Sequence, residues 1–265
     1  MKIYGRITIY GEYLMHDNEQ GLIMPSNLYL ETTDNKDYKS EYNKELDKVL
    51  ISLKDKGIIP SHTLKGNLPL GYGLAGSTIL GFLHLSHIEN IIIKKNIINE
   101  IDTKMHGFTP SGLDFESCVH QQWGLFCSKY GWKSQAPSLI DYSIIIFPKE
   151  QKMPLNKIQE RVLSERRLLV PIQKELNEIV KRHNIVNLEL LMEYAKILSS
   201  IGVYSEVANE FVDNVLKQGY IAKGIGGLYD KAVIVIHNRN KENNSDIESL
   251  ELPTLGRVVA NLRHM

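Results

Sequence analysis

The chain has 265 residues, of which 43% are hydrophobic and 23% are charged, as is ordinary for a globular protein with one large core or two smaller ones. Its 31 basic and 31 acidic side chains cancel, which argues against the broad positive field that binds nucleic acid or an anionic membrane. No stretch approaches the roughly 18 apolar residues of a membrane span, and the start lacks the apolar segment of a signal peptide, so we expect a cytoplasmic protein.

The first half of the chain alternates between two apolar patterns. Runs of β-branched and aromatic residues predict strands at 2–10, 22–32 and 61–66. Apolar residues at helical spacing predict helices at 41–56, 79–85 and 91–105, with a further helix beginning after the turn at 106–112.

The second half begins with two strands, expected at 124–129 and 142–147, and the turn formers between them suggest a domain boundary. We therefore predict domains at 1–137 and 138–265. Helical spacing follows from 154 to 200, with breaks expected near Pro171 and Asn184, and again at 205–217. The apolar run 231–236 predicts a buried strand, and the polar stretch 237–249 a loop.

A glycine-rich turn, Pro69 to Thr78, lies directly before the helix predicted at 79–85. Such a turn lets backbone N–H groups approach phosphate oxygens at a helix N-terminus. The residues expected to form this cradle are Gly71, Gly73, Ala75 and Gly76, with the hydroxyls of Ser77 and Thr78 available to phosphate or Mg²⁺. Because no lysine precedes Ser77, the turn is not a Walker-type P-loop. Taken alone, it could equally be a structural turn.

Two carboxylates, Asp102 and Asp114, flank a second turn that contains Gly107, Pro110 and Gly112. One acid could bind a metal while the other orients or deprotonates a hydroxyl, which is the division of labour in phosphoryl transfer. Either acid could instead cap a helix. A third turn, Ala222 to Gly227, is also rich in glycine and could be an ordinary hairpin loop.

The order of these turns, together with the N-terminal segment Gly5 to Glu12, resembles the GHMP kinases, and among them the mevalonate kinases most. The resemblance implies a two-domain α+β fold. Its N-terminal domain is related to domain 2 of ribosomal protein S5 and binds ATP, and its C-terminal domain is ferredoxin-like. ATP and Mg²⁺ are the implied cofactors.

The resemblance also implies roles for single residues. Asp114 falls on the catalytic aspartate, and Arg6 on the basic residue that offsets charge near the reacting oxygen. Glu12 matches an acid of the substrate pocket, and Tyr13 stands where mevalonate kinases have histidine.

For the metal, the resemblance implies Ser77 and Asp102 as ligands, with Asp102 in place of the family's glutamate. Gly224 and Gly226 fall on the family's last glycine loop, beside the substrate.

The sequence therefore predicts a kinase that moves the γ-phosphoryl of ATP to the hydroxyl of a small alcohol, with mevalonate as first choice in an isoprenoid pathway. Another alcohol is the first alternative: a sugar, an amino acid or phosphomevalonate. A non-catalytic nucleotide-binding regulator with the same fold is the second. We expect a monomer or homodimer with no nucleic-acid or membrane partner.

Overall fold

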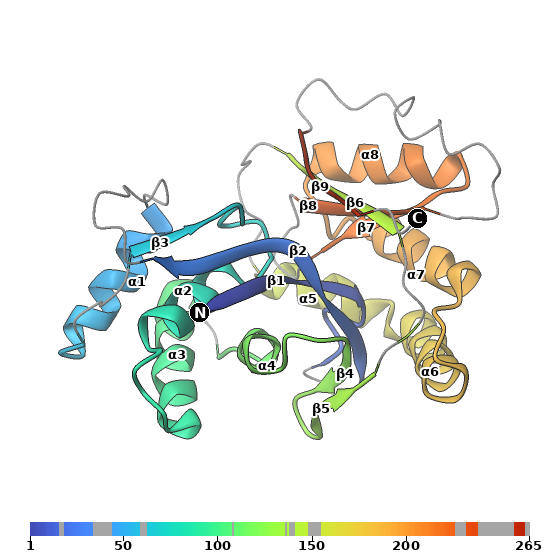
Figure 1. The fold of residues 1–265 in the computed structure, drawn as a ribbon. Helices are drawn as coiled ribbons and strands as arrows, with labels where there is room; N and C mark the ends of the chain where they lie inside the picture. Colours follow the sequence, from blue (N-terminus) through green and yellow to red (C-terminus); the bar gives the residue numbers. More distant parts are fainter. Residues whose placement is uncertain are drawn as a thin grey trace.

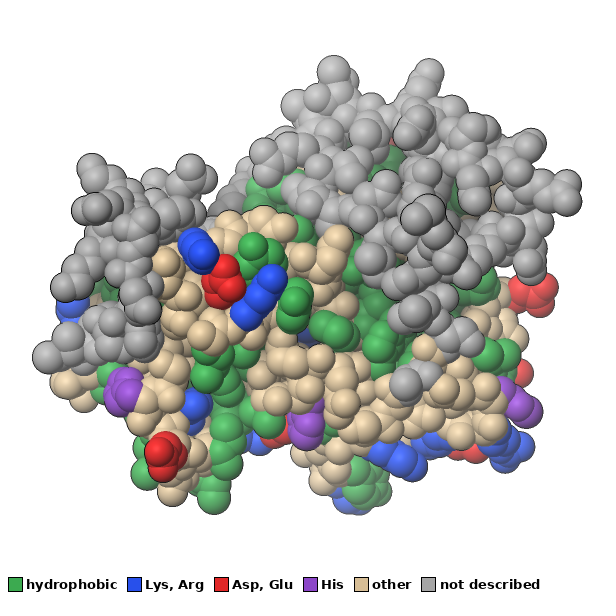
Figure 2. Space-filling model, viewed as in Figure 1, with side chains coloured by type: hydrophobic (Ala, Val, Ile, Leu, Met, Phe, Trp, Pro, Cys, Tyr) green, Lys and Arg blue, Asp and Glu red, His purple; other side chains and the backbone are tan. Residues whose placement is uncertain are grey.

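A computed structural model of the chain describes residues 1–15, 19–33, 44–58, 63–107, 109–135, 137, 141–147, 155–225, 232–237 and 257–262. Helices and strands gather around two antiparallel sheets, each built largely from one half of the chain (Figure 1). Acidic and basic side chains both appear on the face in Figure 2, as expected for a chain with balanced charge. No helix in the described ranges has both the length and the hydropathy to cross a bilayer.

The first sheet has the order β1-β2-β4-β5, and β3 pairs with the far end of β2. Its strands are β1 (Lys2–Tyr10), β2 (Gly21–Thr33), β3 (Thr63–Gly66), β4 (Gly124–Cys127) and β5 (Gly131–Ser134). Residues 5–10 of β1 are all buried, because β2 pairs with this strand while α2 and α4 pack against it. This burial makes β1 a rigid support for the polar side chains it carries.

Four helices accompany the first sheet. They are α1 (Lys44–Asp55), α2 (Gly76–His84), α3 (Ile91–His106) and α4 (Leu113–His120). Helix α3 begins where the Asn90 side chain accepts hydrogen bonds from the N–H groups of Ile92 and Ile93, and ends at Gly107 in the left-handed conformation. Both α2 and α4 contact β1, so the start of each helix lies near that strand.

The second sheet has the order β7-β8-β6-β9. Its elements are β6 (Asp141–Ile146), α5 (Leu155–Ser164), α6 (Arg166–His183), α7 (Leu188–Ser200), α8 (Glu206–Lys217), β7 (Ile221–Gly224), β8 (Ala232–His237) and β9 (Arg257–Leu262). The apolar run predicted as a buried strand is confirmed as β8, whose residues 232–236 are all buried. Helices α7 and α8 both pack against β7 (Figure 1).

Most predicted helices and strands are confirmed, but three details differ. The break expected near Pro171 is wrong: α5 ends at Ser164, and Pro171 lies inside α6. Proline removes only one hydrogen bond, and the buried face formed by Leu169, Leu176 and Val180 keeps the helix continuous. The short strand β5 and the late strand β9 were not predicted. The loop expected at 237–249 falls, after its first residue, outside the described residues.

The two sheets separate along the chain between Ser134 and Asp141. A domain boundary between 137 and 138 stays a prediction, because a single apolar core runs through both sheets. Polar contacts also join the two halves: Tyr10 Oη donates to Asn177 Oδ1 at 3.1 Å, and Asn177 Nδ2 donates to the carbonyl of Gln20 at 2.8 Å. Asn177 on α6 therefore forms hydrogen bonds with the last residue of β1 and with the residue before β2.

Replacing Asn177 with alanine should lower the free energy of unfolding by about 2–3 kcal/mol, because a buried hydroxyl and a backbone carbonyl both lose a hydrogen-bond partner. Urea unfolding followed by circular dichroism measures this loss. The matched control is Glu178→Ala on the same helix, which removes exposed ion pairs to Lys181 and Arg182 and should change stability by less than about 0.5 kcal/mol. Equal effects of the two substitutions would contradict this role of Asn177.

Candidate functional site

The glycine-rich turn has an unusual backbone, in which every second residue is left-handed. The φ angles are +81° at Gly71, +76° at Gly73 and +65° at Ala75. Glycine adopts this conformation at little cost, whereas an alanine in it is strained by about 1–2 kcal/mol. The alternation carries the chain tightly round to Gly76, where α2 begins.

The N-terminus of α2 is formed without a side-chain cap. Its N-cap residue is Ala75, whose methyl group accepts no hydrogen bond from the first N–H groups of the helix. The helix dipole and these N–H groups together favour an anion at this point. The predicted phosphate cradle is thus a left-handed turn that runs into an open helix N-terminus.

Strand β1 packs directly against this turn. The Arg6 N–H donates to the carbonyl of Leu74 at 3.3 Å. At Gly5 an added Cβ would lie 2.5 Å from Leu68 Cδ1 and 3.3 Å from the Leu74 carbonyl oxygen, so a glycine is needed for the close approach. The first strand and the glycine-rich turn therefore form one unit, with Arg6 at their junction.

Arg6 forms an ion pair with Asp114, in which Nε donates to Oδ1. Asp114 lies in the first turn of α4, after Gly112 in the left-handed conformation, and about a third of its side chain is exposed. Arg6 Nη1 also donates to Thr8 Oγ1 at 2.6 Å. The guanidinium is thus fixed between Thr8 and Asp114, while Asp114 keeps access to solvent.

Asp102 lies beside this pair but is much more deeply buried, with 5% of its surface exposed. Burial raises the pKa of this carboxyl to about 6. The nearby charge of Asp114 also raises it, whereas hydrogen bonds from Thr78 and Ser77 oppose the shift. Thr78 Oγ1 donates to Asp102 Oδ2 at 2.6 Å, and Asp102 Oδ1 has no hydrogen-bond partner among the described residues.

The donor set around Asp102 fits a magnesium ion held jointly with a phosphate ligand. Carboxylate and hydroxyl oxygens are hard ligands, and Mg²⁺ is usually bound by one or two carboxylates together with substrate phosphates. The described residues hold no cluster of three or more His, Cys, Asp and Glu side chains that could bind a metal alone. The buried Oδ1 of Asp102 accepts no hydrogen bond in the described structure, so this oxygen is available to a cation.

The structure brings most of the predicted site residues together. Arg6, Ser77, Asp102 and Asp114 form one cluster beside the glycine-rich turn, which supplies the predicted Gly71, Gly73, Ala75, Gly76 and Thr78. The roles expected for these residues remain predictions, but their proximity is a feature of the fold.

The predicted substrate residues lie apart from open solvent. The Glu12 side chain is 2% exposed and forms an ion pair with Lys223 at 2.7 Å, and Tyr13 is buried. Gly224 is the last residue of β7, and its carbonyl accepts a hydrogen bond from Lys223. Gly226 lies outside the described residues. Contact of these residues with a substrate stays a prediction.

Sequence reasoning missed two residues of this region, Thr8 and Lys223. Thr8 follows Arg6 by two positions, and residues i and i+2 of a strand share a face, so this contact could have been predicted from the spacing. Lys223 belongs to the third glycine-rich turn, but its contacts with β1 join residues more than 200 positions apart. No local pattern in the sequence indicates them.

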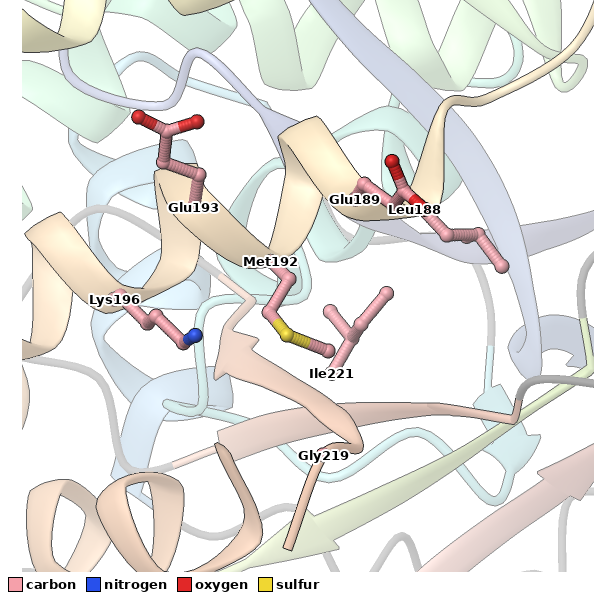
Figure 3. A pocket seen from close by; sticks show the side chains of 7 residues that line it. All are labelled: Leu188, Glu189, Met192, Glu193, Lys196, Gly219 and Ile221. Atoms are coloured by element: carbon pink, nitrogen blue, oxygen red, sulfur yellow. The ribbon is translucent and has the colours of Figure 1, made fainter. Parts of the chain in front are cut away.

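A pocket of about 340 Å³ lies elsewhere, between α7 and β7 (Figure 3). Leu188, Met192 and Ile221 give it apolar walls. The side chain of Glu193 points away from Ile221, on the opposite side of the helix from Met192 (Figure 3). None of the predicted site residues lines this pocket, so it is separate from the cluster around Asp102 and Asp114.

No model of a protein family matches the sequence, and a search of curated proteins finds no similar chain. Solved structures do match over almost the whole length. The mevalonate kinase of Methanococcus jannaschii has a TM-score of 0.71 at 14% identity and covers 100% of this chain and 98% of its own. The mevalonate kinase of L. major, in complex with R-mevalonate, has a TM-score of 0.67 at 13% identity, with 97% and 94% covered.

The phosphomevalonate kinase of Streptococcus pneumoniae, in complex with phosphomevalonate and AMPPNP, matches with a TM-score of 0.64 at 13% identity, covering 97% of this chain and 99% of that one. The chain therefore has the fold of the GHMP kinases, as the order of its turns predicted. At this level of identity the similarity establishes the fold alone.

The ionisation of Asp102 should make the free energy of unfolding depend on pH. Because the folded-state pKa of about 6 lies above the ordinary pKa of 3.8 for an aspartate, ionisation destabilises the fold as pH rises between these values. In buffer without divalent cations, Asp102→Asn should be more stable than the wild type by about 2–3 kcal/mol at pH 7.5 and by less than about 1 kcal/mol at pH 4.

Urea unfolding at pH 4, 5, 6 and 7.5 tests this expectation. The control is Asp55→Asn, which weakens an exposed ion pair with Lys104 and should shift stability by less than about 0.5 kcal/mol throughout. An Asp102→Asn difference that stays constant with pH would show that the carboxyl does not titrate as described.

Proposed function

We propose that this chain is an ATP-dependent kinase that transfers the γ-phosphoryl group to the hydroxyl of a small alcohol. The observation that supports this most is the arrangement of two unlike carboxylates beside the glycine-rich turn, one at the start of α4 and one held by the start of α2. Asp114 is partly exposed and paired with Arg6, whereas Asp102 is buried and held by the hydroxyls of α2. The two acids therefore suit two different tasks.

Phosphate binding is assigned to the left-handed turn and the start of α2. Backbone N–H groups from Gly71 to Ser77 would contact the phosphates, where glycine leaves room for close approach and the helix dipole favours negative charge. Gly76 packs closely on Leu70, whose Cδ2 would lie 2.7 Å from an added Cβ and would have to move to admit a side chain. The compact turn is consistent with this assignment.

Asp114 would orient the acceptor hydroxyl and take up its proton, because it is the exposed acid of the pair. Arg6 would offset negative charge that builds up on the moving phosphoryl group. Its guanidinium is held in place on both sides, by Thr8 and by Asp114, so little reorganisation is needed during the reaction.

Ser77 and Asp102 would hold Mg²⁺ together with the nucleotide phosphates, in agreement with the hard oxygen donors found there. When bound, the ion supplies positive charge that neutralises the phosphates. It would also offset the free-energy cost of ionising the buried Asp102 carboxyl, whose Oδ1 accepts no hydrogen bond in the described structure.

Mevalonate is the first choice of acceptor, supported by the fold shared with two mevalonate kinases. Phosphomevalonate, a sugar or an amino acid remain alternatives, because Tyr13 replaces the histidine typical of mevalonate kinases and is buried here. A regulator that binds nucleotide without turnover is the candidate from another class. The ion pair between Arg6 and Asp114 favours the enzyme over the regulator.

The decisive experiment combines ATP binding with turnover. A coupled assay for ADP release, run with mevalonate, phosphomevalonate, a sugar and an amino acid, identifies the acceptor. Asp114→Asn should lower kcat on the order of 10²–10⁴-fold if the carboxylate takes up the proton, while ATP binding persists.

The matched control is Glu116→Gln on the same helix, where Glu116 pairs with Lys95 at 2.6 Å instead of Arg6. This variant should keep kcat within about threefold of the wild type, as expected for a carboxylate outside the cluster. Unchanged turnover in Asp114→Asn would contradict the proposal that Asp114 takes up the proton of the acceptor hydroxyl. ATP binding by the wild type without turnover on any acceptor would support the regulator.

A further inference from the structure

A lysine of the second sheet is buried against the first strand of the chain. The Lys223 side chain is 0% exposed, and its Nζ lies 2.7 Å from Glu12 Oε1. It donates to the carbonyl of Thr8 at 3.0 Å and also to the carbonyl of Gly224. The ammonium group therefore makes two hydrogen bonds to backbone carbonyls and an ion pair with a carboxylate whose own oxygens accept no hydrogen bond in the described structure.

This lysine joins the two halves of the molecule. Lys223 lies on β7 of the second sheet, whereas Thr8 lies on β1 of the first. The Thr8 N–H in turn donates to the carbonyl of Ile225 at 3.4 Å. The carbonyl of Thr8 is thus hydrogen-bonded to the Lys223 side chain, and the N–H of Thr8 is hydrogen-bonded to the backbone of Ile225. Both peptide groups of Thr8 are therefore held by the segment 223–225.

Thr8 is also the residue that holds Arg6. Its hydroxyl accepts a hydrogen bond from Arg6 Nη1 at 2.6 Å, and Arg6 Nε donates to Asp114. A continuous series of polar contacts thus runs from Lys223 through Thr8 and Arg6 to Asp114. A shift of β1 at Thr8 would move the guanidinium relative to the carboxylate.

Stability alone does not account for a buried lysine at this position. An ion pair taken out of water is often no more stabilising than apolar residues of the same volume. The surroundings of Lys223 would suit such a replacement, because β7 and β8 are buried along residues 221–224 and 232–236. Among the contacts that an apolar side chain could not make, the hydrogen bond to the carbonyl of Thr8 is the one that reaches the first sheet through its backbone.

We propose that Lys223 is a positioning residue, which fixes β1 at Thr8 and thereby sets the position of Arg6 against Asp114. Its effect on turnover rests on the proposed kinase function. Its effect on the position of β1 does not.

Removing the lysine alone is a poor test, because Glu12 Oε2 has no hydrogen-bond partner among the described residues and would be left as an uncompensated buried charge. The informative variant is the double substitution Lys223→Met with Glu12→Gln, which removes both charges and keeps the side-chain sizes similar. Glu12→Gln alone, in which the ammonium keeps its hydrogen bonds to the carbonyls of Thr8 and Gly224, is the reference. Lys196→Met, at an exposed lysine on α7 beside β7, is the matched control for the loss of a lysine.

The first measurement is the turnover of each folded variant. A positioning role predicts that kcat of the double variant falls on the order of 10- to 100-fold below that of Glu12→Gln, with the KM for ATP within about threefold, since misplacing a catalytic group affects turnover more than binding. A purely structural ion pair predicts equal kcat values for the double variant and Glu12→Gln. Equal values would overturn the proposal.

The second measurement is independent of catalysis. Amide hydrogen exchange of the β1 peptide 5–12 should become faster on the order of 10-fold at Thr8 in the double variant, at matched global stability, and stay unchanged in Lys196→Met. Unchanged exchange at Thr8 would also overturn the proposal. If the wild type shows no phosphoryl transfer, the proposed function fails, and this exchange experiment still decides whether Lys223 fixes β1.

Discussion

The balance of charge around Asp102 and Asp114 is the constraint on which the rest of the site depends. Burial disfavours the charged form of Asp102, the nearby charge of Asp114 disfavours it further, and Arg6 is bonded to Asp114. Asp102 is left with the hydroxyls of Ser77 and Thr78, and its pKa is raised to about 6. Under the proposed function, the missing positive charge arrives with the nucleotide and its metal. The empty site then bears a cost that binding removes.

The charged groups of this cluster come from separate segments of the fold. Strand β1 supplies Arg6, α3 supplies Asp102 and α4 supplies Asp114. The N–H of Arg6 on β1 donates a hydrogen bond to the carbonyl of Leu74 in the left-handed turn before α2. This contact places β1 beside the turn. The two acids have different environments because Asp102 is buried on α3, whereas about a third of the Asp114 side chain is exposed at the start of α4. That difference in burial, more than the residue type, separates the tasks of the two carboxylates.

The sequence allowed prediction of the features that are local in the chain. Helix α8 has one apolar buried face, α3 has clear signals at both ends, and the apolar run of β8 is buried as expected. The strands β5 and β9 were missed because short strands are defined by their partners more than by their own residues. The helix break predicted near Pro171 is absent, because the packing of the buried face of α6 outweighs the loss of one backbone hydrogen bond. The site residues were predicted from the resemblance to the GHMP kinases, and their roles stay predictions. The contact between Lys223 and Thr8 joins distant segments, so no local pattern in the sequence indicates it.

The buried pair of Glu12 and Lys223 also bears on the acceptor. Because these two charges neutralise each other inside the protein, neither offers a net charge to a bound substrate. An anionic acceptor such as mevalonate would approach two carboxylates, of which Arg6 offsets one. Its carboxylate would therefore need a cation from the nucleotide complex or from another part of the chain, whereas a neutral sugar would not. Under the proposed function, the charge of the acceptor therefore separates a neutral sugar from an anion such as mevalonate.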